Sequence, residues 1–269
     1  MNNNLKIYCV TDKPLFRLEN TFLKLAGVGK NTFSNFYLRS DTKENINSKE
    51  LHYSELTFHY WYWKNLLKND QSEWIGFCQK RRFWIKENFD NAKISNENLI
   101  NHLLTEIPNN LQDYESFLCK SISVNNVKKI KMLKKGFKSL IKKPSIFFKP
   151  EIQSLKFHFD MHHGDGNLDK AINCLHKKDQ EDFRKYMLDN VSFHPHIMFI
   201  TKSHIAEKWF TDLFDWLFKC EKIFGFENLK GYETTRLYAY LAERYLSFWF
   251  TKYTKFRSMP WVLCDMSSK

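Results

Sequence analysis

The sequence lacks several features that define whole classes of protein. No apolar run approaches the ~18–20 residues needed to cross a bilayer. The polar start at Met1–Asn4 shows no signal-peptide pattern, which predicts a cytoplasmic protein. The six cysteines are scattered and form no CxxC pair, which argues against a structural zinc site or a secreted disulfide framework. No P-loop or GxGxxG phosphate-binding motif occurs either.

Acidic residues are missing from one long segment. Residues 127–150 contain nine lysines and no aspartate or glutamate. Without those nine, the 42 basic residues of the chain fall nearly to the number of its 30 acidic ones, so the net charge of +12 belongs mainly to this segment. A nucleic-acid binder usually spreads its basic residues over a docking face. We therefore interpret the basicity as a local feature and expect no nucleic-acid partner.

What the sequence does contain is a core and an alternating pattern of elements. Apolar residues make up 43% of the chain and aromatic residues 17%, enough for a packed core. Short apolar runs, typical of strands, alternate with helical periodicity, which predicts an α/β fold with a mainly parallel sheet. The predicted strands are 5–10, 74–78, 145–148, 196–200 and 259–263; the predicted helices begin at a cap on Ser54, cover about 205–223 and cover about 233–250.

Ligands of such sheets bind beyond the carboxyl ends of the strands. That rule predicts a common site for Thr11–Lys13, Gln79–Arg82 and Lys149-Pro150. Residues 95–142 are interpreted as an insertion that ends in a basic helix, because apolar residues recur every three or four positions over 127–142 and lysines fill the rest. An amphipathic basic helix of this type can lie on an anionic membrane surface. The alternative is a solvated helix packed on the domain by its apolar stripe.

Several motifs occur in an order that resembles a known family. They are Ile7–Pro14, Asp41–Ile46, Tyr53–Thr57, Tyr60–Asn65, Ile75–Phe83, Ile146–Pro150, Met161–His163, Met198–Ile200 and Leu241–Arg244. Together they resemble a bacterial family of polysaccharide-cluster proteins, long catalogued as a domain of unknown function. That family includes the galactofuranosyltransferase module of some O-antigen polymerases. Asp12, Gln79 and Lys80 depart from its pattern, which has Thr-His-Lys-Pro at the first motif and His-Tyr-Arg-Arg-Tyr at the fifth.

The resemblance implies a GT-A-like fold, an α/β/α sandwich that holds a nucleotide sugar at the carboxyl edge of its sheet. We expect one domain over 1–269, with a nucleotide-sugar-binding half (1–94), the basic helical insertion (95–142) and an acceptor or catalytic half (143–269). The implied function is transfer of a hexose or galactofuranose, with inversion, from a nucleotide-sugar donor, UDP-linked in our interpretation, to a surface-polysaccharide acceptor. The acceptor would be a glycan or a lipid-linked glycan, and the location cytoplasmic or peripheral on the inner membrane.

A nucleotide-sugar donor leaves as a diphosphate, whose developing charge the enzyme must neutralise. Many transferases of this fold use a metal ion held by an Asp-x-Asp motif after a strand. After residues 74–78 this chain has Lys80-Arg81-Arg82 and no acid. Because arginine is permanently charged and binds phosphate bidentately, Arg81 and Arg82 are predicted to replace the metal. Catalysis is expected to need no cofactor, with Mn²⁺ or Mg²⁺ as the alternative; both arginines can equally be surface charges paired with carboxylates.

An inverting transfer needs a general base for the acceptor hydroxyl. Glu243 is the candidate, because it shares a polar stripe with Arg236, Tyr240 and Ser247 on a helix that is otherwise apolar. A structural ion pair between Glu243 and an arginine is the competing interpretation.

The remaining candidates are nucleotide or sugar contacts. The resemblance and the strand-end rule suggest Thr11, Lys13, Asp41 and Asn45 for the nucleotide, Lys149 for the donor, and His163 for hydrogen bonding to a sugar or phosphate. Each of these residues can also be ordinary turn or core chemistry.

Two other functions stay open from the sequence. The lysine-rich segment 127–150 can belong to a non-enzymatic binder of nucleic acid or acidic lipid. His158 and His162, at the i and i+4 spacing of zinc ligands, can belong to a His/Asp metal-dependent hydrolase. That second alternative is weaker, because Phe159 stands where metalloproteases have their catalytic glutamate.

Overall fold

The computed structural model describes residues 5–87, 93–125, 136, 141 and 144–267. They form two compact units: the first from 1–120, 196–212 and 249–269, the second from 121–195 and 213–248. The long helices α9 (Ser203–Phe224) and α11 (Leu237–Tyr253) contribute residues to both. These boundaries do not follow the three segments expected from the sequence.

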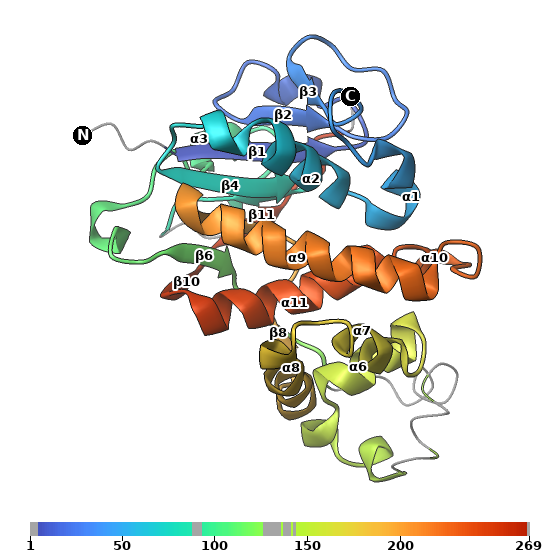
Figure 1. Ribbon diagram of the computed structural model, residues 1–269. Helices are drawn as coiled ribbons and strands as arrows, with labels where there is room; N and C mark the ends of the chain where they lie inside the picture. The colour runs from blue at the N-terminus through green and yellow to red at the C-terminus, as the bar shows by residue number, and fades with distance from the viewer. Residues whose placement is uncertain (1–4, 88–92, 126–135, 137–140, 142–143, 268–269) are drawn as a thin grey trace. The chain divides into compact units, whose positions relative to one another are not determined.

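The first unit is built on one large, mainly parallel sheet (Figure 1). Its strands are β1 (Leu5–Thr11), β2 (Lys24–Gly27), β3 (Tyr37–Arg39), β4 (Trp74–Gln79), β5 (Arg82–Trp84), β6 (Ser116–Cys119), β9 (Phe199–Lys202), β10 (Phe256–Met259) and β11 (Trp261–Leu263). Their order is β10-β6-β9-β4-β1-β2-β3, with β5 and β11 as a branch at the end of β4. The four strands β3, β2, β1 and β4 are parallel, whereas β9 runs antiparallel to β4 and β6.

Both faces of this sheet are buried, as expected for a parallel sheet covered by helices. Successive side chains of a strand point to opposite faces. On one face Tyr8, Phe77 and Phe199 pack in an aromatic cluster with α2 (Leu56–Asn65) and with the first part of α9. On the other face the alternate residues Ile7, Cys9 and Cys78 join a core that includes residues of η1 (Phe16–Leu18), α3 (Leu99–His102) and η5 (Asn109–Leu111). The short elements η2 (Asn47–Lys49), α1 (Glu50–Tyr53) and η3 (Leu67–Asn69) flank α2 in the chain.

The register of the parallel strands aligns their carboxyl ends. Thr11 lies opposite Gly27, Gly27 opposite Arg39, and Gln79 opposite Val10. The backbone continues these ladders beyond the strands, since Val28 N–H donates to the Thr11 carbonyl at 2.9 Å and Lys80 N–H donates to the Val10 carbonyl at 3.1 Å. The segments after β1, β2, β3 and β4 therefore leave the sheet at the same edge.

The second unit is mainly helical. It contains the short strands β7 (Ile122–Ser123) and β8 (Ser192–Phe193), the 3₁₀ turns η6 (Pro144–Phe147) and η7 (Pro150–Ile152), and the helices α6 (Leu155–His163), α7 (Asn167–Ile172), α8 (Lys177–Asp189) and α10 (Tyr232–Thr235), with parts of α9 and α11. Ser154 caps α6 by accepting from Phe157 N–H. No helix among the described residues has both the length and the apolarity to span a membrane.

Several expectations from the sequence are confirmed and others are wrong. The strands at 5–10 and 74–78 and the helix over 205–223 are found. The predicted strand 145–148 is not found, and Pro144–Phe147 form the 3₁₀ turn η6 instead, because a run with only three apolar residues does not by itself distinguish a strand from a turn. Ser54 does not cap α2 with its side chain; it has a positive φ of 52°, and its carbonyl accepts from Thr57 N–H. The helix expected over 127–142 lies mostly outside the described residues.

Candidate active site

The carboxyl edge of the sheet in the first unit carries most of the residues selected from the sequence. Thr11 ends β1 and Lys13 follows it, Asp41 and Asn45 follow β3, Arg81 lies in the turn between β4 and β5, and Arg82 begins β5. Glu243, His163 and Lys149 belong to the second unit.

Thr11 shapes the turn after β1. It is buried, and its hydroxyl accepts from Lys13 N–H at 3.0 Å and donates to the Lys13 carbonyl. This turn leaves the Lys13 side chain exposed at the edge of the sheet.

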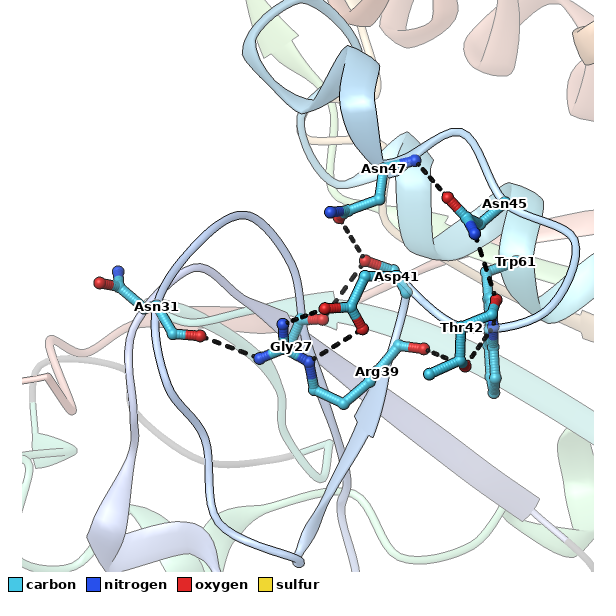
Figure 2. Close-up of polar contacts among 9 residues, drawn as sticks. Gly27, Asn31, Arg39, Asp41, Thr42, Asn45, Asn47 and Trp61 are labelled. Atoms are coloured by element: carbon cyan, nitrogen blue, oxygen red, sulfur yellow. Dashed lines mark hydrogen bonds and ion pairs between the residues drawn. The ribbon is translucent and has the colours of Figure 1, made fainter.

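Arg39, the last residue of β3, organises the segment that follows (Figure 2). Its guanidinium holds both carboxylate oxygens of Asp41, at 2.7 and 3.3 Å, and donates to the Asn31 carbonyl at 2.9 Å. These hydrogen bonds from Arg39 lower the pKa of Asp41. Arg39 also lies over the Phe33 ring, 4.8 Å from its centroid. Because β3 has only three residues, the sequence did not identify it, and Arg39 was missed with it.

Asn45 fixes the loop after Asp41 rather than pointing its amide outward (Figure 2). Its Nδ2 donates to the Thr42 carbonyl at 3.4 Å, and its Oδ1 accepts from Asn47 N–H at 3.0 Å. The same Nδ2 lies 2.8 Å from the Lys43 carbonyl. Trp61 on α2 donates from Nε1 to the Thr42 carbonyl at 2.8 Å. The loop is thus anchored to α2, which fixes the position of Asp41 at its start.

The turn after β4 presents two cations with different surroundings. Arg81 is at the tip, about half exposed, with a long 3.8 Å contact to the Asp265 carboxylate. Arg82 is less exposed and donates to the Gln79 amide oxygen at 3.0 Å, while the Gln79 amide nitrogen donates to Glu55. Lys80, which precedes Arg81, forms an ion pair with Asp12 after β1.

In the second unit Glu243 is paired with its neighbour Arg244. Arg244 NH1 lies 2.6 Å from Glu243 Oε2, and the Arg244 side chain is 2% exposed. The guanidinium also lies 3.6 Å from the centroid of the Phe193 ring and donates to His158 Nδ1 at 3.4 Å. Since arginine only donates, His158 carries its proton on Nε2. The ion pair that competed with catalysis in the sequence interpretation of Glu243 is therefore present.

His163, the last residue of α6, stacks on Tyr240 of α11 with ring centroids 3.9 Å apart. Its Nδ1 lies 2.8 Å from the Glu233 carbonyl, which can only accept, so the Nδ1 carries the proton and Nε2 is an acceptor. Burial is the main cause that lowers the pKa of His163 to about 3, so the ring is neutral near pH 7. A neutral acceptor nitrogen suits a hydroxyl group better than a phosphate.

Lys149 does not follow a strand. It is exposed between η6 and η7, and its N–H donates to the Ser145 carbonyl at 3.1 Å. The strand-end argument that selected Lys149 is wrong for this residue, because the preceding apolar run turns instead of extending.

The zinc site considered for His158 and His162 is not assembled. His158 faces the Arg244 cation, and His162 Nδ1 lies 3.1 Å from Glu233 Oε1. Within the described part of the chain, no three His, Cys, Asp or Glu side chains are grouped to hold a metal ion.

Comparison with known proteins defines the fold and the family. The apo structure of WbbM, a bifunctional glycosyltransferase, superposes with a TM-score of 0.74 at 22% sequence identity, and the match covers 97% of this chain and 45% of that chain. The present chain therefore spans less than half the length of that structure. Together with four parallel strands and an antiparallel neighbour in the sheet, the match confirms the predicted α/β, GT-A-like fold. No curated protein matches. The model of the DUF4422 family, described as a domain of unknown function, matches residues 6–255, and the chain belongs to this family.

Proposed function

We propose that the chain is a glycosyltransferase that binds a nucleotide-sugar donor, UDP-linked, at the carboxyl edge of strands β3, β2, β1 and β4. The observation that supports this most directly is the register that ends four parallel strands together, each followed within three residues by a polar or charged side chain. Open α/β sheets bind their ligands at this edge. A structural neighbour described as a glycosyltransferase supports the same class of reaction.

Cationic side chains at this edge would hold the diphosphate of the donor. Arg81 is the most available, because a contact of 3.8 Å between half-exposed groups is weak and a diphosphate can replace it. Lys13 is exposed beside it on the neighbouring strand end. Arg82 is already oriented by Gln79. With permanent charges in place, we propose that transfer does not require a metal ion.

Glu243 is proposed as the general base that takes the proton from the acceptor hydroxyl. Arg244 holds the Glu243 carboxylate in place through a contact of 2.6 Å to Oε2. The Glu243 side chain is 16% exposed, so it is not sealed from an acceptor. Direct proton transfer to this base corresponds to a single displacement with inversion.

The transferred sugar is proposed to be a hexose or galactofuranose, and the acceptor a surface polysaccharide or its lipid-linked precursor. The nine lysines of 127–150 fit the second form of acceptor, since each lysine near an anionic leaflet contributes about 1 kcal/mol of attraction. A location at the inner membrane face follows from that proposal.

The donor site is tested first by thermal shift with free nucleotides and nucleotide sugars, because a ligand selective for the folded state raises its melting temperature. UDP and UDP-sugars should stabilise the wild type. The Arg81→Ala variant should lose most of the shift. Arg257→Ala is the matched control: Arg257 is 39% exposed on β10 and pairs with Glu87 at 3.1 Å, but it is far from β1–β3 in the sheet order. Equal shifts in both variants would contradict the proposed diphosphate site.

Turnover then tests the chemistry. Activity in EDTA should equal activity with Mn²⁺ or Mg²⁺, and strict dependence on either ion would contradict the metal-independent mechanism. Glu243→Gln should lower kcat about 10²–10⁴-fold with donor binding intact. If Glu243→Gln keeps its activity, another group is the base.

A further inference from the structure

Strand β4 has β1 on one side and β9 on the other, and side chains next to β9 also lie near the carboxyl end of β4. Strand β9 runs antiparallel to β4, with Phe199 opposite Phe77. The residues that lead into β9, from His196 to Met198, therefore run beside the carboxyl end of β4, where Gln79 and the Arg81–Arg82 turn begin.

The backbone at this point is strained. His196 has a φ of 71° and Ile197 a φ of 22°, both in the left-handed region that non-glycine residues avoid. The β-branched Ile197 is especially disfavoured there. Such conformations persist where the surrounding structure holds them, and they concentrate at ligand sites.

The surroundings of the His196 ring include an aromatic and a cationic side chain. The ring packs edge-on against Trp261 of β11, with centroids 4.6 Å apart and planes at 80°. On β5, Arg82 lies two residues before Trp84, the ladder partner of Trp261, so the Arg82 side chain points to the same face of the ladder as that of Trp84. Burial, with a further contribution from Arg82, lowers the pKa of His196 to about 3, so its imidazole is neutral near pH 7.

Arg82 and His196 thus offer complementary chemistry at one place. Arg82 is a fixed cation, oriented by Gln79, which is itself held by Glu55. The neutral imidazole offers one N–H donor and one nitrogen acceptor, as a sugar hydroxyl requires. A nucleotide sugar carries an anionic diphosphate for the first and sugar hydroxyls for the second, and a phosphoester bond joins the diphosphate to the sugar.

We propose that Arg82 and His196 form the wall of the donor site at which the diphosphate meets the sugar. Arg82 binds the diphosphate, and His196 hydrogen-bonds a hydroxyl of the transferred sugar. Trp261 is a positioning residue that holds the imidazole in place. This inference rests on the proposed glycosyltransferase function and adds the residue that reads the sugar.

The test is isothermal titration calorimetry of two ligands, UDP and UDP-galactose, against wild type, His196→Asn and Arg82→Ala. Asparagine tolerates positive φ better than most residues, so His196→Asn keeps the backbone and removes the ring. It should weaken UDP-galactose about tenfold and leave UDP within twofold, whereas Arg82→Ala should weaken both. His102→Asn, on α3 of the same unit, is the matched control and should change neither affinity.

Any other result contradicts one part of the proposal. If folded His196→Asn binds UDP-galactose as tightly as wild type does, His196 does not contact the donor and the inference is wrong. If it weakens UDP equally, the imidazole serves the phosphate and the sugar contact is wrong. If wild type binds neither ligand, the proposed function fails and the inference fails with it. Melting temperatures separate loss of contact from loss of fold, and His196→Gly, which relieves the strain, should bind as His196→Asn does.

Discussion

Lys80 and Asp12 form an ion pair that joins the ends of strands β4 and β1. Both residues depart from the pattern of the family that the sequence resembles, which has a tyrosine and a histidine at these places. In the structure the two residues are partners, since each supplies the charge opposite to that of the other.

Separating the two charges should change ligand binding in opposite directions. Asp12→Ala leaves Lys80 available to an anion and should tighten UDP binding about two- to fivefold, whereas Lys80→Ala should weaken it by a similar factor. The side chains are 41% and 26% exposed, so both effects should shrink as salt rises. Titration calorimetry at two salt concentrations measures them. Effects of the same sign would show that the pair acts through the fold and not through its charge.

Arg244 should be far more important to stability than any surface arginine. It is 2% exposed, paired with Glu243 and stacked on Phe193. Removing one partner of a buried ion pair leaves the other charge uncompensated, so Arg244→Ala should cost about 3–5 kcal/mol of unfolding free energy. Arg184→Ala is the control, since Arg184 is 30% exposed and should cost no more than about 1 kcal/mol. Urea unfolding measures both, and equal losses would contradict the burial of Arg244.

The central strands and long helices could be predicted because their signals are strong and local. The run at 74–78 and the helical spacing over 205–223 each identify a whole element. The strand-end rule then placed Thr11, Lys13, Arg81 and Arg82 on one edge without any contact being known.

Short elements and long-range pairs could not be predicted in this way. Strand β3 has three residues, too few for an alternating pattern, so Arg39 was overlooked. The apolar run 145–148 has the composition of a strand, but prolines at 144 and 150 turn it, and the argument for Lys149 fails with it. Arg244 and His196 were overlooked because their partners are distant in the sequence. Only the fold brings Arg244 to His158 and His196 to Trp261.

His59 should make the protein less stable in acid. It is buried among Phe77, Phe199 and Phe210, and burial lowers its pKa to about 3. In the unfolded chain its pKa is near 6.5, so the unfolded state binds the extra proton between these values. The stability is therefore complete above about pH 6.5 and is lost as the pH falls toward 3. The slope from one such group approaches 1.4 kcal/mol per pH unit.

Replacing His59 with leucine should remove the contribution of this histidine to the pH dependence of the unfolding free energy. The slope of unfolding free energy between pH 6 and 4.5 should fall by about 1 kcal/mol per pH unit relative to wild type. His176→Leu is the control, because His176 is 56% exposed. A slope unchanged in His59→Leu would mean that the ring is hydrated or charged in the folded state.

Cys174 should be the reactive cysteine of the six. It is partly exposed, whereas the other five are buried. A hydrogen bond from Cys220 is the main cause that lowers the pKa of Cys174 to about 7, with the Lys219 charge contributing. Because the thiolate is the nucleophile, iodoacetamide at pH 7.5 should modify Cys174 first. Peptide mapping by mass spectrometry measures the order, and Cys220→Ala, which removes the hydrogen bond, should slow the modification. First labelling of Cys264 would contradict the exposure order.

Gly27, at the end of β2, tests whether the loop behind Asp41 matters for the donor. A Cβ there would lie 2.8 Å from the Phe33 ring, and that ring supports Arg39, which holds Asp41. Gly27→Ala should therefore displace Phe33 and Arg39, cost about 1–3 kcal/mol of stability and weaken UDP binding about tenfold. Gly76→Ala, in the middle of β4, is the matched control. Its Cβ would lie 2.8 Å from the Ile200 side chain of β9, so it should cost similar stability without changing the UDP affinity of the folded protein. Equal UDP affinities in the two variants would show that the Arg39–Asp41 arrangement does not contribute to the donor site.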